Sequence, residues 1–153
     1  MRNWDDSFPR TVQGKGEALT LAASVARGVA ASGNGTAFDI DGRVAMGILL
    51  KFTDKQADGT DTCDVFIDLL LGAIWVNAIH FTQAFGNGTD AASEYALILP
   101  TSGLTTPTVV TSDAASGVVR PEVVGSQIRA RWAIVDGGGA VASFTFGVTA
   151  WAL

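Results

Sequence analysis

The sequence predicts an all-β fold, a single antiparallel β-sandwich of the jelly-roll or immunoglobulin-like type with an extended N-terminal arm. Two observations predict it. Apolar side chains alternate with polar or small ones over several short stretches, as in strands that bury one face. Glycine-rich turn dipeptides separate these stretches, and glycine makes up 18 of the 153 residues. The length suits one domain, so we expect residues 18–153 to form the sandwich and residues 1–17 the arm.

Three expected strands lie in the first half of the chain. Leu19 and Leu21 begin an alternation, although the alanine-rich stretch 18–31 leaves a helix as an alternative. A polar loop is expected over residues 54–62, between the next two strands. These two strands carry the clearest same-face apolar sets, which are Val44, Met46, Ile48, Leu50 and Phe52 on the first, and Cys63, Val65, Ile67 and Leu69 on the second.

Two further expected strands follow. Residues 74–85 are largely apolar and are predicted as one strand region. Residues 94–99 are predicted as a short strand that stops at Pro100, because proline cannot donate a hydrogen bond to a neighbouring strand. One helical turn over residues 90–96 is the alternative at that place.

The C-terminal third contains a weak strand nucleus at Val109 and Val110 and then two strong strands, 127–135 and 143–151. The turn 136–139 lies between the strong strands and contains three glycines, which accept the positive φ of tight hairpins. We therefore expect these two strands to pair with each other as a hairpin.

Charge and composition exclude several classes of function. The chain has 10 Lys and Arg against 15 Asp and Glu, a net charge of −5, so we expect no nucleic-acid partner. No apolar run is long enough to cross a membrane and the N-terminus lacks a signal-peptide pattern, so we expect cytoplasmic synthesis and no membrane partner. Hydrophobic residues form 48% of the chain and charged residues 16%, which favours apolar contacts with partner proteins.

The chain has one cysteine and one histidine, which is too few for most catalytic and metal sites that use these residues. Cys63 alone can form neither an internal disulfide nor an all-cysteine zinc site, and we expect it in the core. His80 lies in an apolar strand and has no local nucleophile signature. We therefore expect no enzymatic activity, no catalytic residue, no cofactor and no metal.

The densest acidic cluster is the set Asp54, Asp58, Asp61 and Asp64. Calcium favours several carboxylate oxygens from one flexible loop, but the EF-hand spacing is absent here. We interpret the cluster as a solvated hairpin loop and keep a structural calcium site as the lesser alternative.

Four residues are candidate interface residues. Trp4 and Phe8 are large and apolar within the polar arm, and buried aromatic side chains dominate interface energies. Arg129 and Arg131 share the non-core face of strand 127–135, where they would bridge to acidic residues of a neighbouring subunit or keep a sheet edge soluble.

Tryptophans on the expected strands leave a second function open. Trp75, Trp132 and Trp151 would stack on sugar rings if they were exposed, as in a carbohydrate-binding module that contacts cell-surface glycans. Buried tryptophans that fill a sandwich core are the commoner arrangement.

The chain also resembles the small β-sandwich structural proteins of tailed bacteriophages. The likeness covers most of the sequence after residue 17 and lies in strand and turn patterns. Its clearest parts are the Asp64–Asp68 strand followed by Trp75-Val76-Asn77 and Phe81-Thr82-Gln83, and the run Ile128–Trp132 followed by a glycine turn and Ser143–Val148.

This resemblance implies a virion component of the capsid-decoration or head–tail type. It implies assembly with other copies of the chain, as a homo-oligomer, and with capsid or head–tail proteins. It implies no catalytic residue.

Overall fold

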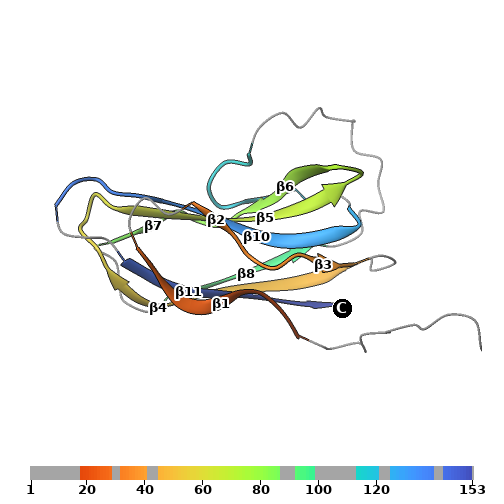
Figure 1. The fold of residues 1–153 in the computed structure, drawn as a ribbon, viewed down its shortest axis with the longest axis horizontal. Coiled ribbons are helices and arrows are strands. Elements are labelled where there is room, and N and C mark those ends of the chain that lie inside the picture. Colours follow the sequence, from red (N-terminus) through yellow and green to blue (C-terminus); the bar gives the residue numbers. More distant parts are fainter. Residues whose placement is uncertain are drawn as a thin grey trace, which may run out of the picture.

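A computed structural model describes residues 18–28, 32–40, 45–86, 92–98, 113–120, 125–139 and 143–152. These residues form two antiparallel sheets that pack face to face, which confirms the predicted β-sandwich (Figure 1). The strands are β1 (Ala18–Gly28), β2 (Gly33–Asn34), β3 (Phe38–Asp39), β4 (Met46–Gln56), β5 (Thr62–Leu71), β6 (Ile74–His80), β7 (Ala84–Phe85), β8 (Ala92–Ile98), β9 (Val118–Val119), β10 (Gln127–Val135) and β11 (Ser143–Ala152).

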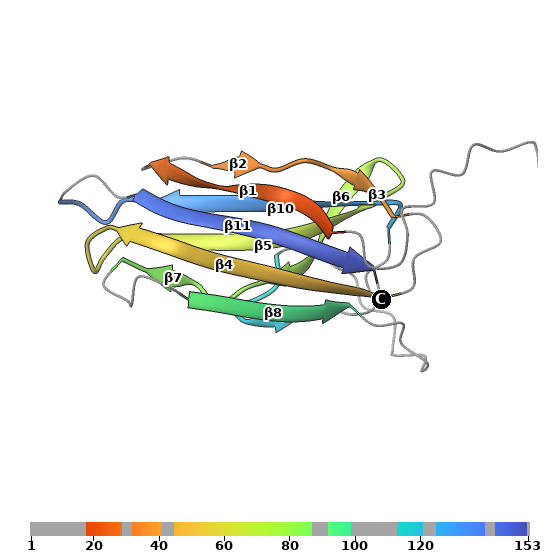
Figure 2. The same ribbon diagram turned by 90° about the horizontal axis from the view of Figure 1, so that it is seen from below.

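The strand order distinguishes between the two predicted sandwich types. The four-stranded sheet has the order β1-β11-β4-β8, and Figure 2 shows it face on. The seven-stranded sheet has the order β2-β10-β5-β6-β9, with β3 also on β10 and β7 also on β5. If β2 and β3 are taken as one interrupted strand and the two-residue β7 and β9 are set aside, eight strands remain, four in each sheet. The chain changes sheet between successive strands except from β5 to β6, and this is the jelly-roll order.

The expected hairpin between the last two strands is wrong. β10 pairs with β5 along its whole length, whereas β11 lies between β1 and β4 in the other sheet. β10 and β11 each have one apolar face. Two such strands can lie side by side in one sheet, or they can lie in opposite sheets and pack against each other across the core. The connection between the strands therefore crosses from one sheet to the other.

The core lies between the two sheets and follows the predicted alternation. Phe144 and Phe146 of β11 are fully buried, and Phe52 of β4 packs against both rings at centroid distances of 6.3 and 5.3 Å. Every second residue of β5 and β10 faces the core from the opposite side. Trp132 is partly buried, and the fully or nearly fully buried members are Cys63, Val65, Ile67, Leu69, Ile128, Ala130 and Ile134.

Several element boundaries differ from the predictions. β4 continues to Gln56, inside the expected polar loop, because its backbone pairs with β11 as far as Ser143. The region 74–85 is interrupted after His80, and Phe81 instead donates its backbone N–H to the carbonyl of Val65. The two helical alternatives, over residues 18–31 and 90–96, are wrong in the described residues. These stretches instead form the paired strands β1 and β8.

The remaining predictions concern residues outside the described part of the chain. These are the N-terminal arm, residues 1–17, and the strand nucleus at Val109 and Val110. Within the described segments, no helix is long and apolar enough to cross a membrane.

Candidate functional site

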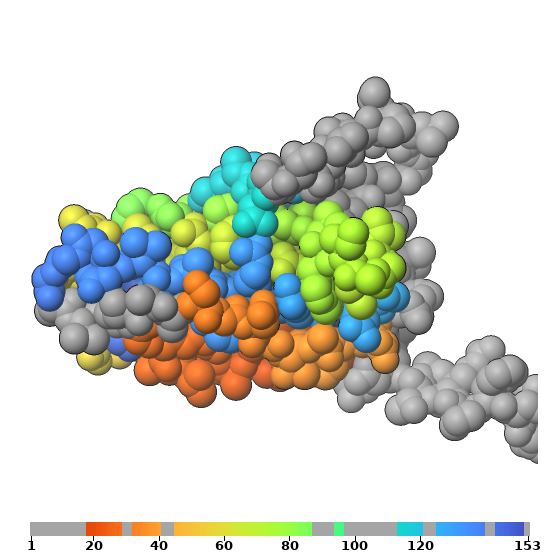
Figure 3. All heavy atoms as spheres, turned by 45° about the horizontal axis from the view of Figure 1, so that its top comes forward, coloured from red at the N-terminus to blue at the C-terminus, as the bar shows by residue number. Residues whose placement is uncertain are grey.

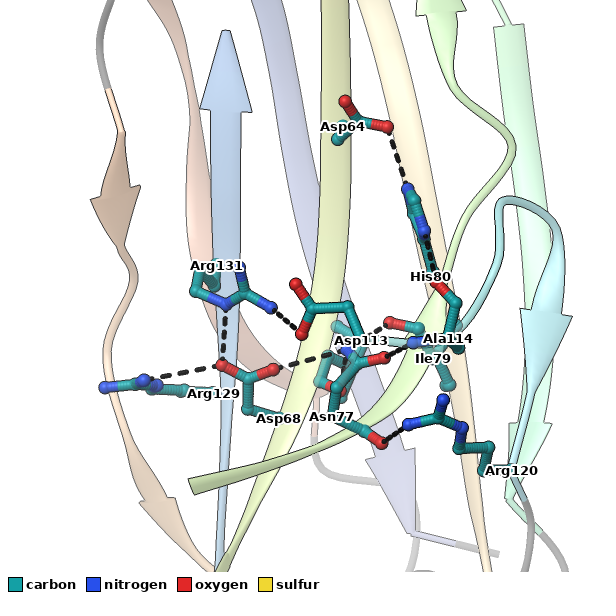
Figure 4. A network of polar contacts seen from close by, with 11 residues as sticks. Asp64, Asp68, Asn77, Ile79, His80, Asp113, Ala114, Arg120, Arg129 and Arg131 are labelled. Atoms are coloured by element: carbon teal, nitrogen blue, oxygen red, sulfur yellow. Dashed lines mark hydrogen bonds and ion pairs between the residues drawn. The ribbon is translucent and has the colours of Figure 1, made fainter. Parts of the chain in front are cut away.

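Charged and aromatic side chains gather on the outer face of the seven-stranded sheet. Alternation along β5 and β10 directs Asp68, Arg129 and Arg131 away from the core. The strand register places Asp68 beside Arg129, and Phe66 beside Arg131. β6 adds Asn77 and His80, and residues 113–120 pack over part of this face (Figure 4). Trp75 of β6 lies beside Arg129.

Arg131 pairs with two carboxylates of its own chain. Its Nε donates to Asp68 Oδ2 at 3.0 Å, and its Nη2 donates to Asp113 Oδ1 at 2.7 Å. Its guanidinium also lies 4.0 Å from the ring centroid of Phe66. Burial lowers the pKa of Arg131, but the hydrogen bonds and charges of Asp68 and Asp113 outweigh this effect and raise the pKa overall. Arg131 is therefore held as a cation by its own chain.

His80 connects the sheet to the segment 113–120. Its Nε2 lies 2.8 Å from Asp64 Oδ1 and its Nδ1 lies 2.8 Å from the carbonyl oxygen of Ala114. Both partners are acceptors, so both contacts are hydrogen bonds when each ring nitrogen carries a hydrogen. Neither nitrogen faces a nucleophile. The ring also stacks on Phe66, with the centroids 4.2 Å apart.

Asn77 also holds the segment 113–120 in place. Its side chain is buried, and its Oδ1 accepts the backbone N–H of Ala114 at 2.9 Å. Its Nδ2 donates to the carbonyl of Ile79 at 2.9 Å and to Asp68 Oδ1 at 3.3 Å. Asn77 and His80 thus hold both backbone groups of Ala114.

Arg129 is held much less completely than Arg131. Its Nη2 reaches Asp68 Oδ2 at 3.4 Å, and its buried Nε has no hydrogen-bond partner among the described residues. Its guanidinium stacks 4.1 Å from the ring centroid of Trp75.

An exposed apolar tip lies next to Trp75, at the turn between β5 and β6. We use the name apolar tip for residues 71–74, in which Leu71 is 56% exposed and Ile74 is 69% exposed. Gly72 supplies the positive φ of 62° that this turn requires. Figure 3 shows the hairpin, in yellow-green, at one end of the molecule. Only the fold shows that these two aliphatic side chains are exposed.

The expected solvated acidic loop is wrong at Asp61. This residue is fully buried, and its two carboxylate oxygens accept the backbone N–H groups of Asp58 at 2.6 Å and Gly137 at 2.8 Å. Asp64 serves His80 and Gln83 instead. The four aspartates therefore do not converge, and the described residues contain no group of three potential metal ligands.

Arg27 is a buried cation that sequence reasoning missed. It donates to the carbonyl oxygens of Phe146, Ala23 and Val25 at 2.7, 2.8 and 2.9 Å. Its guanidinium lies 4.0 Å from the ring centroid of Phe146 and 4.4 Å from that of Trp132. Burial lowers the pKa of Arg27. The run of β-strand residues around it gave no signal, because its acceptors come from the tertiary fold.

The predicted interface residues are placed as follows. Arg129 and Arg131 lie together around Asp68 on a strand that is not at the sheet edge, because β10 has β5 on one side and β2 and β3 on the other. The expectation that they keep a sheet edge soluble is therefore wrong. Trp4 and Phe8 lie outside the described residues.

Comparison of the chain with protein-family models, with curated proteins and with solved structures finds no match. The case for a function therefore depends on the geometry described above and on the sequence resemblance.

Proposed function

We propose that this chain is a non-enzymatic structural protein of a tailed-phage virion. It assembles with itself and with capsid or head–tail proteins, in a decoration or minor capsid role. The apolar tip is the observation that carries the proposal. Burial of a leucine or isoleucine side chain contributes about 1.5–3 kcal/mol, so Leu71 and Ile74 together offer a partner a substantial apolar contact.

The hydrogen-bond partners of the buried and half-buried polar groups support a structural role. The two ring nitrogens of His80, the carboxylate of Asp61 and the guanidinium of Arg131 all serve contacts within the chain. Such groups hold segments in place and are not aimed at a substrate. Jelly rolls also recur in viral capsid proteins, which is an argument by analogy of fold and adds weight without deciding the function.

Solution mass tests this proposal. We expect light scattering after size exclusion, with negative-stain images of each peak, to show a defined oligomer for the wild-type protein. Ile74→Ser should weaken assembly and leave the circular dichroism spectrum unchanged. The matched control is Val25→Ser, a half-exposed apolar residue of β1 in the other sheet. A wild-type protein that is monomeric at all concentrations, or an Ile74→Ser protein that assembles like wild type, would contradict the proposal.

Carbohydrate binding remains a second candidate because of the outer face of the four-stranded sheet. A hollow of about 160 Å³ lies there, lined by three hydroxyl-bearing residues, Lys51, Gly147 and the apolar side chains of Ala22 and Leu49. The exposed ring of Tyr95 lies on the adjacent strand β8, in the same row as Thr149 and Leu49, which both line the hollow. Trp75 and Trp132, in contrast, stack with Arg129 and Arg27.

A glycan array with Tyr95→Ala as the comparison tests this candidate. Binding that the substitution removes would support a sugar site. Absence of binding across a broad panel would eliminate it.

A further inference from the structure

The ring of His80 faces a hydrogen-bond acceptor at each of its two nitrogens (Figure 4). Nε2 lies 2.8 Å from Asp64 Oδ1, and Nδ1 lies 2.8 Å from the carbonyl oxygen of Ala114. A carbonyl oxygen and an ionised carboxylate only accept, whereas a neutral imidazole carries a hydrogen on one nitrogen. The neutral ring can therefore make one of these two hydrogen bonds, and the charged ring can make both.

The carboxylate of Asp64 is the acceptor that a neutral ring keeps. A hydrogen bond to a charged acceptor is stronger than one to a neutral carbonyl. Gln83 donates to the other oxygen of Asp64 at 2.8 Å and so holds this carboxylate in its orientation toward the ring. With its hydrogen on Nε2, the neutral ring turns a bare Nδ1 toward the carbonyl oxygen of Ala114, and the two lone pairs repel. Loss of one proton therefore breaks the contact with the segment 113–120 and leaves the contact within the sheet.

The other charged groups around the ring have partners of their own. These groups are Arg131 on β10, Asp68 on β5, Asp113 and Arg120 in the segment 113–120, and Glu94 on β8. Arg131 pairs with both Asp68 and Asp113, which offset its charge. Arg120 donates to the carbonyl oxygen of Asn77, and Glu94 accepts the backbone N–H of Thr82. Asp64 is the carboxylate that bonds directly to the ring.

Ala114 depends on the charge of His80 for one of its two backbone contacts. It is only 4% exposed, so water has little access to its carbonyl oxygen. Its N–H donates to Asn77 whatever the charge of the ring. A buried carbonyl that loses its donor costs free energy, so the segment opens more often when the ring is neutral.

We propose that His80 is a proton-dependent latch for the segment 113–120. The charged ring holds Ala114 on the outer face of the seven-stranded sheet, and the ring releases one proton to solvent when it lets go of this carbonyl. Because the charged form makes both contacts, the latch is closed at low pH and loosens as the pH rises through the titration of the ring. Histidine is the side chain that ordinarily changes charge near neutral pH. The latch acts within one chain, so it is independent of whether the protein assembles.

A pH series on the wild-type protein tests the latch. His80 is the only histidine of the chain, so the imidazole signals in nuclear magnetic resonance spectra report its charge directly between about pH 5 and about pH 9. Amide exchange in residues 113–120 is measured over the same range and corrected for the intrinsic effect of pH. Protection of the segment should fall about fivefold as the ring becomes neutral, because one hydrogen bond is lost. His80→Gln cannot titrate and should show constant protection.

Asp64→Asn separates a latch from a contact that is only structural. The oxygen of the new amide can still accept from Gln83, and its nitrogen can donate to Nε2 of a neutral ring. The ring then keeps its hydrogen on Nδ1 for Ala114, so the segment should stay protected at every pH in the range. Asp113→Asn makes the same change on a carboxylate that pairs with Arg131, and it should retain the fall in protection.

Each contrary outcome overturns the latch. Wild-type protection that does not follow the charge of the ring does so, and so does a ring that keeps one charge throughout the range. A fall in protection that persists in His80→Gln belongs to another group. A fall that persists in Asp64→Asn shows that the carboxylate does not determine which contact the neutral ring keeps. Circular dichroism confirms that each variant is folded.

Discussion

Arg131 and Arg129 stand two residues apart on one strand, and their surroundings differ in how completely they pair each guanidinium group. Both arginines reach Asp68 and both stack on an aromatic ring. The Arg131 region is completed by Asp113 and lies beside the segment that His80 holds. Arg129 has only the longer contact to the shared carboxylate, and its buried Nε has no partner among the described residues. The same residue types on one strand are therefore paired to very different extents, according to which side chains the fold brings beside them.

Removal of the carboxylate that the two regions share should have the largest effect. Asp68 is buried, so Asp68→Asn leaves two guanidinium groups without their common charge. Breaking a buried ion pair costs about 3–5 kcal/mol, and we expect the free energy of unfolding in urea to fall by about 3 kcal/mol. Asp113→Asn, at the half-exposed end of the network, should cost less than about 1 kcal/mol. Equal losses for the two variants would contradict the assigned roles.

The two arginines should differ in how much they contribute to stability. Arg131→Gln removes two charged hydrogen bonds and should lower the free energy of unfolding by about 2 kcal/mol. Arg129→Gln removes one long contact and should change the free energy of unfolding by less than about 1 kcal/mol. Urea titration measures both quantities, and an equal or larger loss for Arg129→Gln would contradict the comparison.

His80→Ala should act locally on the segment 113–120. The substitution removes the contact to the carbonyl of Ala114, while Asn77 still accepts its N–H. One lost hydrogen bond corresponds to about 1 kcal/mol, which is roughly a fivefold to tenfold rise in local amide exchange. Hydrogen exchange followed by mass spectrometry should show this rise in 113–120 and no change in β11. An increase spread over the whole sheet would mean that His80 supports the core instead.

The titration of Cys63 should have a smaller effect on stability, and it reports on the core beneath the Arg129 and Arg131 regions. Burial, with repulsion from Asp64 and partly offset by Arg27, raises the pKa of its thiol to about 12. The unfolded thiol loses its proton nearer its ordinary pKa of 9.0. Its contribution to stability is therefore complete below about pH 9 and declines as the pH rises toward 12.

Thiol labelling at pH 8 should accordingly be slow in the wild-type protein. It should stay slow in Ile74→Ser, whose change is confined to the tip, and become faster in Asp68→Asn. Fast labelling of the wild-type protein would show that Cys63 is accessible.

The sequence predicted which residues form strands, but it predicted poorly which strands pair with each other. The alternation on β4, β5, β10 and β11 follows from burial of one face, so local pattern is enough to find it. The pairing of β10 and β11 could not be predicted, because a hairpin and a crossing between sheets have the same local pattern.

The polar contacts show the same limit. Alternation placed Arg129 and Arg131 on the outer face, but their partner Asp68 is more than 60 positions away along the chain. Asp61 and Arg27 were misjudged or missed, because backbone groups from distant segments satisfy them. Which of two similar arginines remains incompletely paired is visible only in three dimensions.

The central place of β11 sets an order of events during synthesis. β11 is made after β1 and β4, yet it lies between them and supplies the backbone partners of both. Until it has left the ribosome, the four-stranded sheet has no centre and the core lacks Phe144 and Phe146. Contacts this distant in sequence make folding slow. Chains interrupted before β11 cannot complete the four-stranded sheet, so the sandwich closes only after nearly the whole described chain has been made.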